Sequence, residues 1–373
     1  MKNTLLKALK IFLIAALLLV LLLIVIGIAI ALQWPWWVTL FVLLFITGLI
    51  VGSVFVRKLL TRGRDGKLFN AMLQQDEAQI NDLSGKDKAE KKQMQAKWKE
   101  AIDILRKSHL KKMGNPLYVL PWYMVIGESG SGKTTSLNSA RLATPFPEFG
   151  KTAGISGTRN CDWWFLEQSI IIDTAGRYAI PVNGEPDWME WRKFLSLLAK
   201  YRRKEPLNGL ILFVAADKLI NAGEAALEEE ARTMRRRIDE LMSILGVRFP
   251  VYVLVTKCDL IRGINHFCER LPDESLRQPM GMINQNLSTD IGSFLDNALE
   301  TVGRRLRNMR MLILNQQDPR TVDFPLLFFP EEFDELRGGL SVYVKTLFGS
   351  NPYQETPMLR GLFFSSGRQK GSP

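Results

Sequence analysis

The chain has 373 residues, with 49 lysines and arginines against 38 aspartates and glutamates, and only three cysteines. This length exceeds one ordinary domain, and three scattered cysteines exclude a disulfide-stapled fold. The formal charge of +11 would suit nucleic acid, but no recognised nucleic-acid-binding motif accompanies it, so we expect no nucleic-acid partner.

Two uncharged, apolar runs lie near the amino terminus. Residues 11–32 and 38–56 are each long enough to cross a bilayer as a helix, and lysines and arginines flank the pair on both outer sides. The sequence therefore predicts a cytoplasmic N-terminus at 1–10 and a transmembrane helical hairpin at 11–56, with both ends in the cytoplasm. A cleaved signal peptide, the alternative, would have a shorter apolar core and would leave 38–56 unexplained.

The next stretch, 57–112, is polar, basic and free of proline. This composition predicts a basic helical linker. Two interpretations remain open: a solvated helix, or a helix that binds lipids or a partner. In either case the basic charge beside the lipid bilayer would favour anionic headgroups.

From 113 onward, apolar runs with strand character alternate with helical patterns. The expected strands are 122–126, 170–173, 210–215, 251–256 and 362–365, and the main expected helices are 188–201, 225–245 and 291–314. This alternation predicts an α/β domain at 113–373, with a mostly parallel sheet and helices on both faces. The phosphate-binding motif at 127–134, described next, makes the expected domain P-loop NTPase-like. A helical insertion is expected around 262–358.

The letters GESGSGKT at 127–134 fit G-x-x-x-x-G-K-[ST] between an expected strand and an expected helix. Glycines let backbone N–H groups converge on phosphates, and the helix N-terminus adds partial positive charge. Lys133 is expected to reach the β- and γ-phosphates, and the Thr134 hydroxyl to bind Mg²⁺. The expected phosphate-binding residues are Gly127, Glu128, Ser129, Gly130, Ser131, Gly132, Lys133, Thr134 and Thr135. A Gly/Ser turn that only caps a helix is the alternative.

A second motif, DTAGR, follows the next expected strand. Asp173 is expected to hold Mg²⁺ through water, and Gly176 to offer its N–H to the γ-phosphate. Many small GTPases have a glutamine where this chain has Arg177. A guanidinium only donates hydrogen bonds, so Arg177 could stabilise phosphate charge but could not accept a proton from water.

The segment between these motifs carries a candidate switch threonine. Thr158 could complete the Mg²⁺ shell, with Thr152 as the alternative and an ordinary loop as the other interpretation. The catalytic candidates are thus Lys133, Asp173, Thr158 and Arg177, and the metal candidates Thr134, Asp173 and Thr158. Trp163 and Trp164 are expected to pack in the core rather than stack on a base.

A third motif, TKCD at 256–259, resembles the [NT]-K-x-D guanine motif. A carboxylate at Asp259 would accept hydrogen bonds from guanine and would meet the N1 acceptor of adenine badly. Thr256 and Lys257 are expected beside the base, with Ser365 and Ser366 as further contacts. The expected cofactors are Mg²⁺ and a nucleotide, GTP or ATP.

Taken together, the tryptophan-containing hairpin, the basic linker, and the segments GESGSGKT, GTRNCDWWF, IDTAGRY, TKCD and RGLFFSSG resemble the IcmF/TssM family. These are large inner-membrane subunits of the bacterial type VI secretion membrane complex, and this chain resembles an amino-terminal fragment of one. The DTAGR letters also occur in signal-recognition-particle GTPases, which gives an alternative family.

The IcmF/TssM resemblance implies a multi-pass protein of the bacterial inner membrane with its NTPase-like domain in the cytoplasm. It implies a DotU/TssL-type membrane subunit, a TssJ-type outer-membrane lipoprotein, cytoplasmic baseplate components and further copies of the chain as partners. Two functions fit: an NTPase that drives or times secretion, or a scaffold whose nucleotide, if bound, stabilises a docking domain.

Overall fold

The computed structural model describes residues 86–108, 110, 113–140, 161–181, 184–276, 278–287, 290–315, 324–350 and 355–366, with isolated positions between 31 and 52. The chain divides into two compact units, residues 1–91 and 92–373. The second unit holds the α/β domain.

The expected membrane hairpin falls mostly outside the described residues. Among the residues that are described, no helix is both long enough and apolar enough to span a bilayer. The positions described between 41 and 52 are helical, and Phe41, Leu44, Phe45 and Leu49 are each more than half exposed.

A seven-stranded sheet with the order β2-β3-β1-β4-β5-β7-β6 forms the centre of the second unit. The strands are β1 (Trp122–Gly127), β2 (Cys161–Phe165), β3 (Ile170–Thr174), β4 (Gly209–Ala215), β5 (Pro250–Thr256), β6 (Met280–Ile283) and β7 (Met358–Phe364). The five inner strands are parallel, while β2 and β6 pair antiparallel at the two edges. The predicted mixed α/β sheet is confirmed.

Neither antiparallel edge strand was predicted from the sequence. β2 carries the paired tryptophans, which were expected only to pack in the core, and β6 lies inside the expected helical insertion. β6 is four residues long with only partial burial, so it lacks the continuous apolar run that revealed the inner strands.

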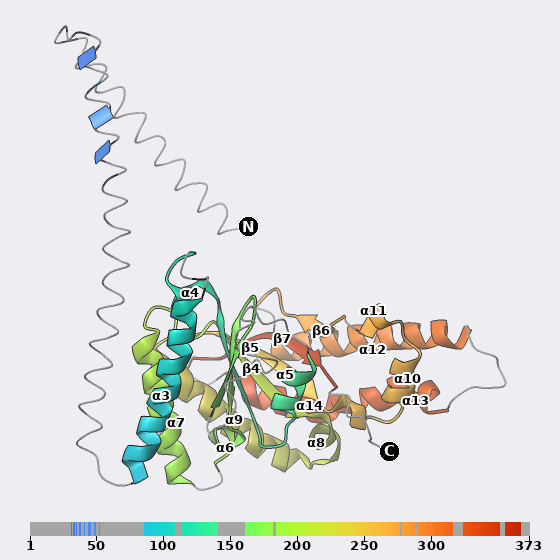
Figure 1. The fold of residues 1–373 in the computed structure, drawn as a ribbon. Coiled ribbons are helices and arrows are strands. Elements are labelled where there is room, and N and C mark those ends of the chain that lie inside the picture. The colour runs from blue at the N-terminus through green and yellow to red at the C-terminus, as the bar shows by residue number, and fades with distance from the viewer. Residues whose placement is uncertain are drawn as a thin grey trace. The chain divides into compact units, whose positions relative to one another are not determined.

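The helices surround the sheet (Figure 1). Their bounds are α3 (Lys86–Lys107), α4 (Pro116–Val119), α5 (Lys133–Ser139), α6 (Gly176–Ala179), α7 (Glu185–Tyr201), α8 (Ala216–Asn221), α9 (Glu224–Leu245), α10 (Ile264–Glu269), α11 (Asp273–Leu276), α12 (Ile291–Asn315), α13 (Phe324–Asp334) and α14 (Leu336–Phe348). A 3₁₀ turn, η3 (Cys258–Leu260), follows β5. The long helices α7, α9 and α12 lie where the apolar periodicity predicted them.

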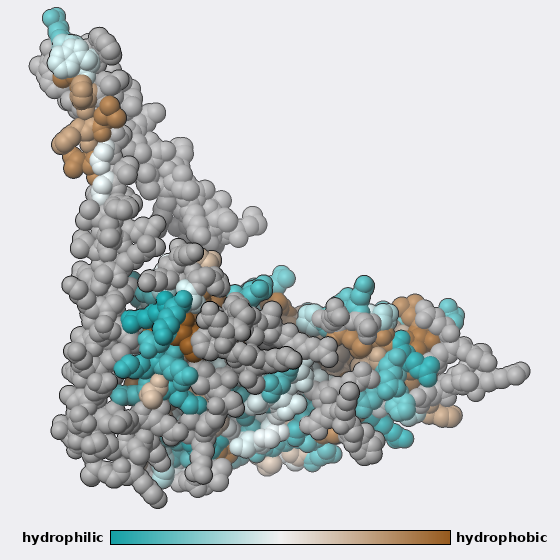
Figure 2. Space-filling model, viewed as in Figure 1, coloured by the Kyte–Doolittle hydropathy of each residue, from teal (hydrophilic) through white to brown (hydrophobic). Residues whose placement is uncertain are grey.

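The helix α3 lies mostly in the second unit, from Lys92 onward. It occupies the second half of the stretch expected to be a linker, and its Trp98, Ala101, Ile102 and Leu105 are buried. The Trp98 ring lies 4.7 Å from the ring of Trp163, centroid to centroid. The part of α3 that Figure 2 draws in colour is mostly hydrophilic on the face turned to the viewer. The interpretation as a solvated linker is therefore wrong for this helix, whose apolar stripe repeats every three to four residues.

The two faces of the sheet are covered unequally. On one face, Trp122 and Trp163 pack against Trp98 of α3. On the other face, Val125 and Trp164 join a smaller cluster in which Tyr123, Ile211 and Leu254 are only partly buried. Trp163 and Trp164 are thus both core residues, as predicted, and they point to opposite faces because successive residues of a strand alternate.

Candidate nucleotide-binding site

The predicted motifs gather at the end of the sheet where the carboxyl ends of its parallel strands lie. The loop after β1, the DTAGR segment after β3, the TKCD segment after β5 and the serines after β7 all follow parallel strands. Because the carboxyl ends of parallel strands lie on the same side of the sheet, these loops gather there. After β1 the chain turns to β3 on one side and later reaches β4 on the other side, and ligands of open α/β sheets bind at such a switch in strand order. The candidate switch residues Thr152 and Thr158 lie outside the described residues.

The P-loop ends in a left-handed residue. Gly132 has φ +81° and forms the N-cap of α5, a conformation that costs a glycine little. After this cap, Lys133 contacts the carbonyls of its own loop and Thr134 contacts Asp173 in β3.

The Lys133 ammonium folds back on its own loop. Its Nζ donates to the carbonyl oxygens of Gly127 at 2.7 Å and Glu128 at 2.8 Å. The side chain is buried, and burial lowers the pKa of Lys133, while the nearby Asp173 and Glu128 carboxylates oppose that shift. An ammonium has three donors, so these two bonds leave one for a ligand.

The Thr134 hydroxyl and the Asp173 carboxylate form the other half of the site. Thr134 Oγ1 donates to Asp173 Oδ2 at 2.7 Å. Asp173 Oδ1 is buried and, within the described part of the chain, has no hydrogen-bond partner. Burial raises the pKa of Asp173, against the opposing effects of the Thr134 hydrogen bond and Lys133.

These two side chains fit a magnesium ion. A hydroxyl and a carboxylate are hard oxygen ligands of the kind that Mg²⁺ accepts, together with waters and phosphate oxygens. The buried, unpaired Oδ1 atom is the kind of polar atom that a bound ion or its water would satisfy. Thr134 and Asp173 would hold the ion, which would neutralise phosphate charge.

The DTAGR segment packs directly on the P-loop. A Cβ added to Gly176 would lie 2.3 Å from the Ser129 backbone nitrogen, so only glycine fits at this contact. The next residue turns away: Arg177 donates to Glu190 at 2.8 Å and lies 3.5 Å from Asp187, both near the start of α7. In this structure the candidate catalytic arginine is held by α7.

Thr256, the threonine of the TKCD segment, forms a hydrogen bond to the P-loop backbone. Thr256 is fully buried, and its Oγ1 donates to the Ser131 carbonyl at 2.6 Å, with the Val214 carbonyl at 3.2 Å. Thr256 was expected beside the base. In the structure its hydroxyl instead donates to the P-loop backbone.

Lys257, Asp259 and Ser366 follow β5 and β7 at the same end of the sheet. Lys257 has φ +54°, and its stem lies 3.9 Å from the position of a Cβ on Gly132. Ser366 Oγ donates to Asp259 Oδ1 at 2.9 Å, and the Ser365 N–H donates to the Val255 carbonyl at 2.8 Å. The structure therefore brings the serines after β7 beside the TKCD carboxylate.

Sequence reasoning missed one charged residue of this site. Lys218 of α8 donates to the side chain of Glu128 at 2.5 Å. No motif marks a lysine at this place, because the contact depends on β4 lying beside β1 in the sheet.

The sheet and the loop after β1 define a P-loop-type α/β domain. Residues 185–373 match the family described as the IcmF-related N-terminal domain, and the chain belongs to that family. The chain is also 37% identical over 290 residues to the type VI secretion system component TssM1 of Pseudomonas aeruginosa, an alignment that covers 74% of this chain and 26% of that relative. It thus spans about a quarter of the length of the curated relative.

Several solved structures show weaker likeness. The signal recognition particle receptor SRb-GTP/SRX complex from Chaetomium thermophilum matches with 16% identity and a TM-score of 0.25, covering 42% of this chain and 85% of that chain. The GDP complex of a SAR1-type GTPase from Encephalitozoon cuniculi matches with 13% identity and a TM-score of 0.26, covering 66% and 90%. These scores are low, and the fold assignment rests on the strand order and the loop geometry.

Proposed function

We propose that this chain is a membrane-anchored subunit of a type VI secretion membrane complex whose P-loop domain binds a purine nucleoside triphosphate with Mg²⁺ and hydrolyses it. The observation that carries the proposal is the contact between Thr134 and Asp173, which leaves a buried carboxylate oxygen without a partner among the residues that the structure describes. A metal site joined to a P-loop is the arrangement that phosphoryl transfer requires.

The base specificity follows from the loop after β5. The side chains of Asp259 and Ser366 lie together, where a carboxylate could accept from the N1 and amino groups of guanine. GTP is the nucleotide that this pair favours, and ATP is the alternative.

The anchoring is proposed from the sequence. The uncharged stretches 11–32 and 38–56 with their basic flanks support an inner-membrane hairpin, with the P-loop domain in the cytoplasm. The exposed apolar side chains at the helical positions between 41 and 49 agree with this, because removing apolar surface from water is favourable. A DotU/TssL-type subunit, a TssJ-type lipoprotein, baseplate components and other copies of the chain are the proposed partners.

A scaffold that does not hydrolyse nucleotide is the second candidate. It is favoured by Arg177, the candidate catalytic arginine, which the structure pairs with Glu190 and Asp187 of α7. In this function the nucleotide, if bound, would stabilise a docking domain without turnover.

The experiment that separates these functions uses Lys133→Ala in the full chain in lipid nanodiscs. Charged hydrogen bonds to phosphate are each worth about 1.5–3 kcal/mol, so nucleotide binding should weaken roughly ten- to a hundredfold. In cells, the enzyme function predicts that secretion falls with turnover while the variant still inserts and assembles. Normal secretion by a folded, inserted Lys133→Ala protein would refute the enzyme function and leave the scaffold.

A further inference from the structure

The second residue of the P-loop carries a negative charge. Glu128 lies directly after the glycine that ends β1, in the loop that we propose for a triphosphate. A carboxylate in such a place opposes the binding of a polyanion because like charges repel. A counter-charge is needed if the loop is to hold phosphate.

Lys218, which follows the neighbouring strand β4, supplies that counter-charge. It lies on α8, the helix that begins where β4 ends, and its Nζ donates to Glu128 Oε2 at 2.5 Å. The same ammonium forms an ion pair with Glu230 of α9. The Glu230 side chain is only 8% exposed, so this second carboxylate holds the ammonium from the protein interior.

The helix that carries Lys218 is itself tightly held. A Cβ added to Gly339 of α14 would lie 2.0 Å from the Leu219 carbonyl oxygen, so α14 packs directly on the backbone of α8. Lys218 thus stands on a fixed element, between one carboxylate of the P-loop and one of α9.

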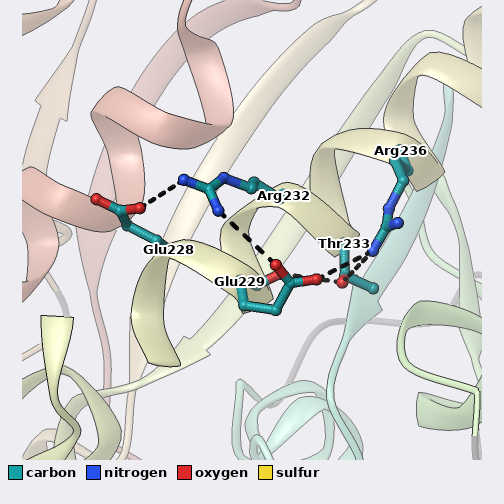
Figure 3. A network of polar contacts seen from close by, with 5 residues as sticks. All are labelled: Glu228, Glu229, Arg232, Thr233 and Arg236. Carbon is teal, nitrogen blue, oxygen red and sulfur yellow. Dashed lines mark hydrogen bonds and ion pairs between the residues drawn. The ribbon is translucent and has the colours of Figure 1, made fainter. Parts of the chain in front are cut away.

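A group of exposed contacts on α9 is of a different kind. Arg232 contacts Glu228 and Glu229, and Arg236 contacts Glu229 and Thr233, all within one helix (Figure 3). Their arginine side chains are 59% and 65% exposed. Exposed pairs of this type contribute little, whereas the Lys218 pairs join the P-loop, α8 and α9.

We propose that Lys218 is a positioning residue of the nucleotide site: it neutralises Glu128 so that the P-loop can accept a phosphate chain, and Glu230 holds it in place. This inference rests on the proposed nucleotide binding. It follows that the loss of Lys218 matters more for a ligand with more negative charge, and that removal of the Glu128 charge compensates for that loss.

The test measures binding of GTP, GDP, ATP and ADP by calorimetry, using the full chain in nanodiscs. Lys218→Met should weaken triphosphate binding roughly tenfold, the scale of one charged hydrogen bond, and diphosphate binding less. Adding Glu128→Gln to Lys218→Met should restore most of the affinity. Arg232→Met, which removes an exposed cation from α9, is the matched control and should bind as the wild type does.

Lys218→Met also leaves Glu230 buried without its cation, which could unfold the domain. Lys218→Met combined with Glu230→Gln removes that penalty, should remain folded by thermal unfolding, and should still bind triphosphate weakly until Glu128→Gln is added. Equal binding by wild type and a folded Lys218→Met variant would overturn the inference, as would a Glu128→Gln change that restores nothing. A wild type that binds no nucleotide at all would overturn the proposed function and the inference together.

Discussion

The Thr134 hydroxyl donates a hydrogen bond of 2.7 Å to the Asp173 carboxylate, and so joins the first turn of α5 to the end of β3. The two residues are 39 positions apart in the chain. Their contact turns two separate motifs into one candidate metal site, and the first prediction concerns it.

Thr134→Ala and Asp173→Ala should each reduce Mg²⁺-dependent turnover more than nucleotide affinity, because these residues hold the metal while the P-loop backbone holds the phosphates. Turnover is measured as phosphate release across a Mg²⁺ titration, and affinity by calorimetry. Thr134→Ser keeps the hydroxyl and should retain most of the activity. Wild-type turnover by Asp173→Ala would remove this carboxylate from the metal site.

The Mg²⁺ requirement should also depend on pH through Asp173. Burial raises the pKa of Asp173, above the ordinary value of about 3.9, and a protonated carboxyl cannot bind the cation. Mg²⁺ affinity should therefore be full at neutral pH and fall as the pH drops toward that raised pKa, sooner than an exposed aspartate would allow. Asp173→Asn should lose this pH dependence, and an unchanged pH profile in that variant would assign the titration to another group.

Thr256→Val should loosen the P-loop. The change keeps the shape of the side chain but removes the donor to the buried Ser131 carbonyl, and an unsatisfied buried group costs about 1–3 kcal/mol. Thermal unfolding should register a lower stability, and nucleotide affinity should fall with it. Thr256→Ser is the matched control, since it keeps the hydroxyl. A Thr256→Val protein as stable as the Ser variant would show that the bond to Ser131 contributes nothing.

Asp259→Asn should shift the base preference. If Asp259 accepts from guanine, the amide should weaken GTP binding and favour xanthosine triphosphate, whose exocyclic oxygen accepts where guanine donates. Competition binding among GTP, xanthosine triphosphate and ATP measures the shift. Wild-type protein that binds ATP at least as well as GTP would disprove the guanine assignment and leave the P-loop assignment intact.

Trp98→Ala should destabilise the α/β domain by roughly 3–5 kcal/mol, the usual loss for a buried tryptophan. Trp98 is 1% exposed and contacts Trp122 and Trp163 in the core. Lys99→Ala, the next residue on the exposed side of α3, should change stability by less than about 0.5 kcal/mol. Chemical unfolding of both variants checks this. If Trp98→Ala were as stable as Lys99→Ala, α3 would be a linker and would not stabilise the domain.

Elements with a local signal could be predicted from the amino-acid sequence alone. The inner strands appear as continuous apolar runs because both of their faces are buried, and α7, α9 and α12 appear through their apolar periodicity. The P-loop letters 127–134 were readable because a phosphate site needs glycine, lysine and a hydroxyl at fixed spacing.

Features that depend on contacts between distant segments could not be predicted and are seen only in the folded structure. The edge strands β2 and β6, the packing of α3 and the pairing of Arg177 with α7 come from contacts between distant segments. Lys218 faces Glu128 because β4 lies beside β1. Thr256 reaches Ser131 because the strand order β1-β4-β5 brings the end of β5 near the loop after β1. A single sequence records side-chain chemistry and local spacing, whereas strand order is set by the burial of the whole sheet, and strand order placed these side chains together.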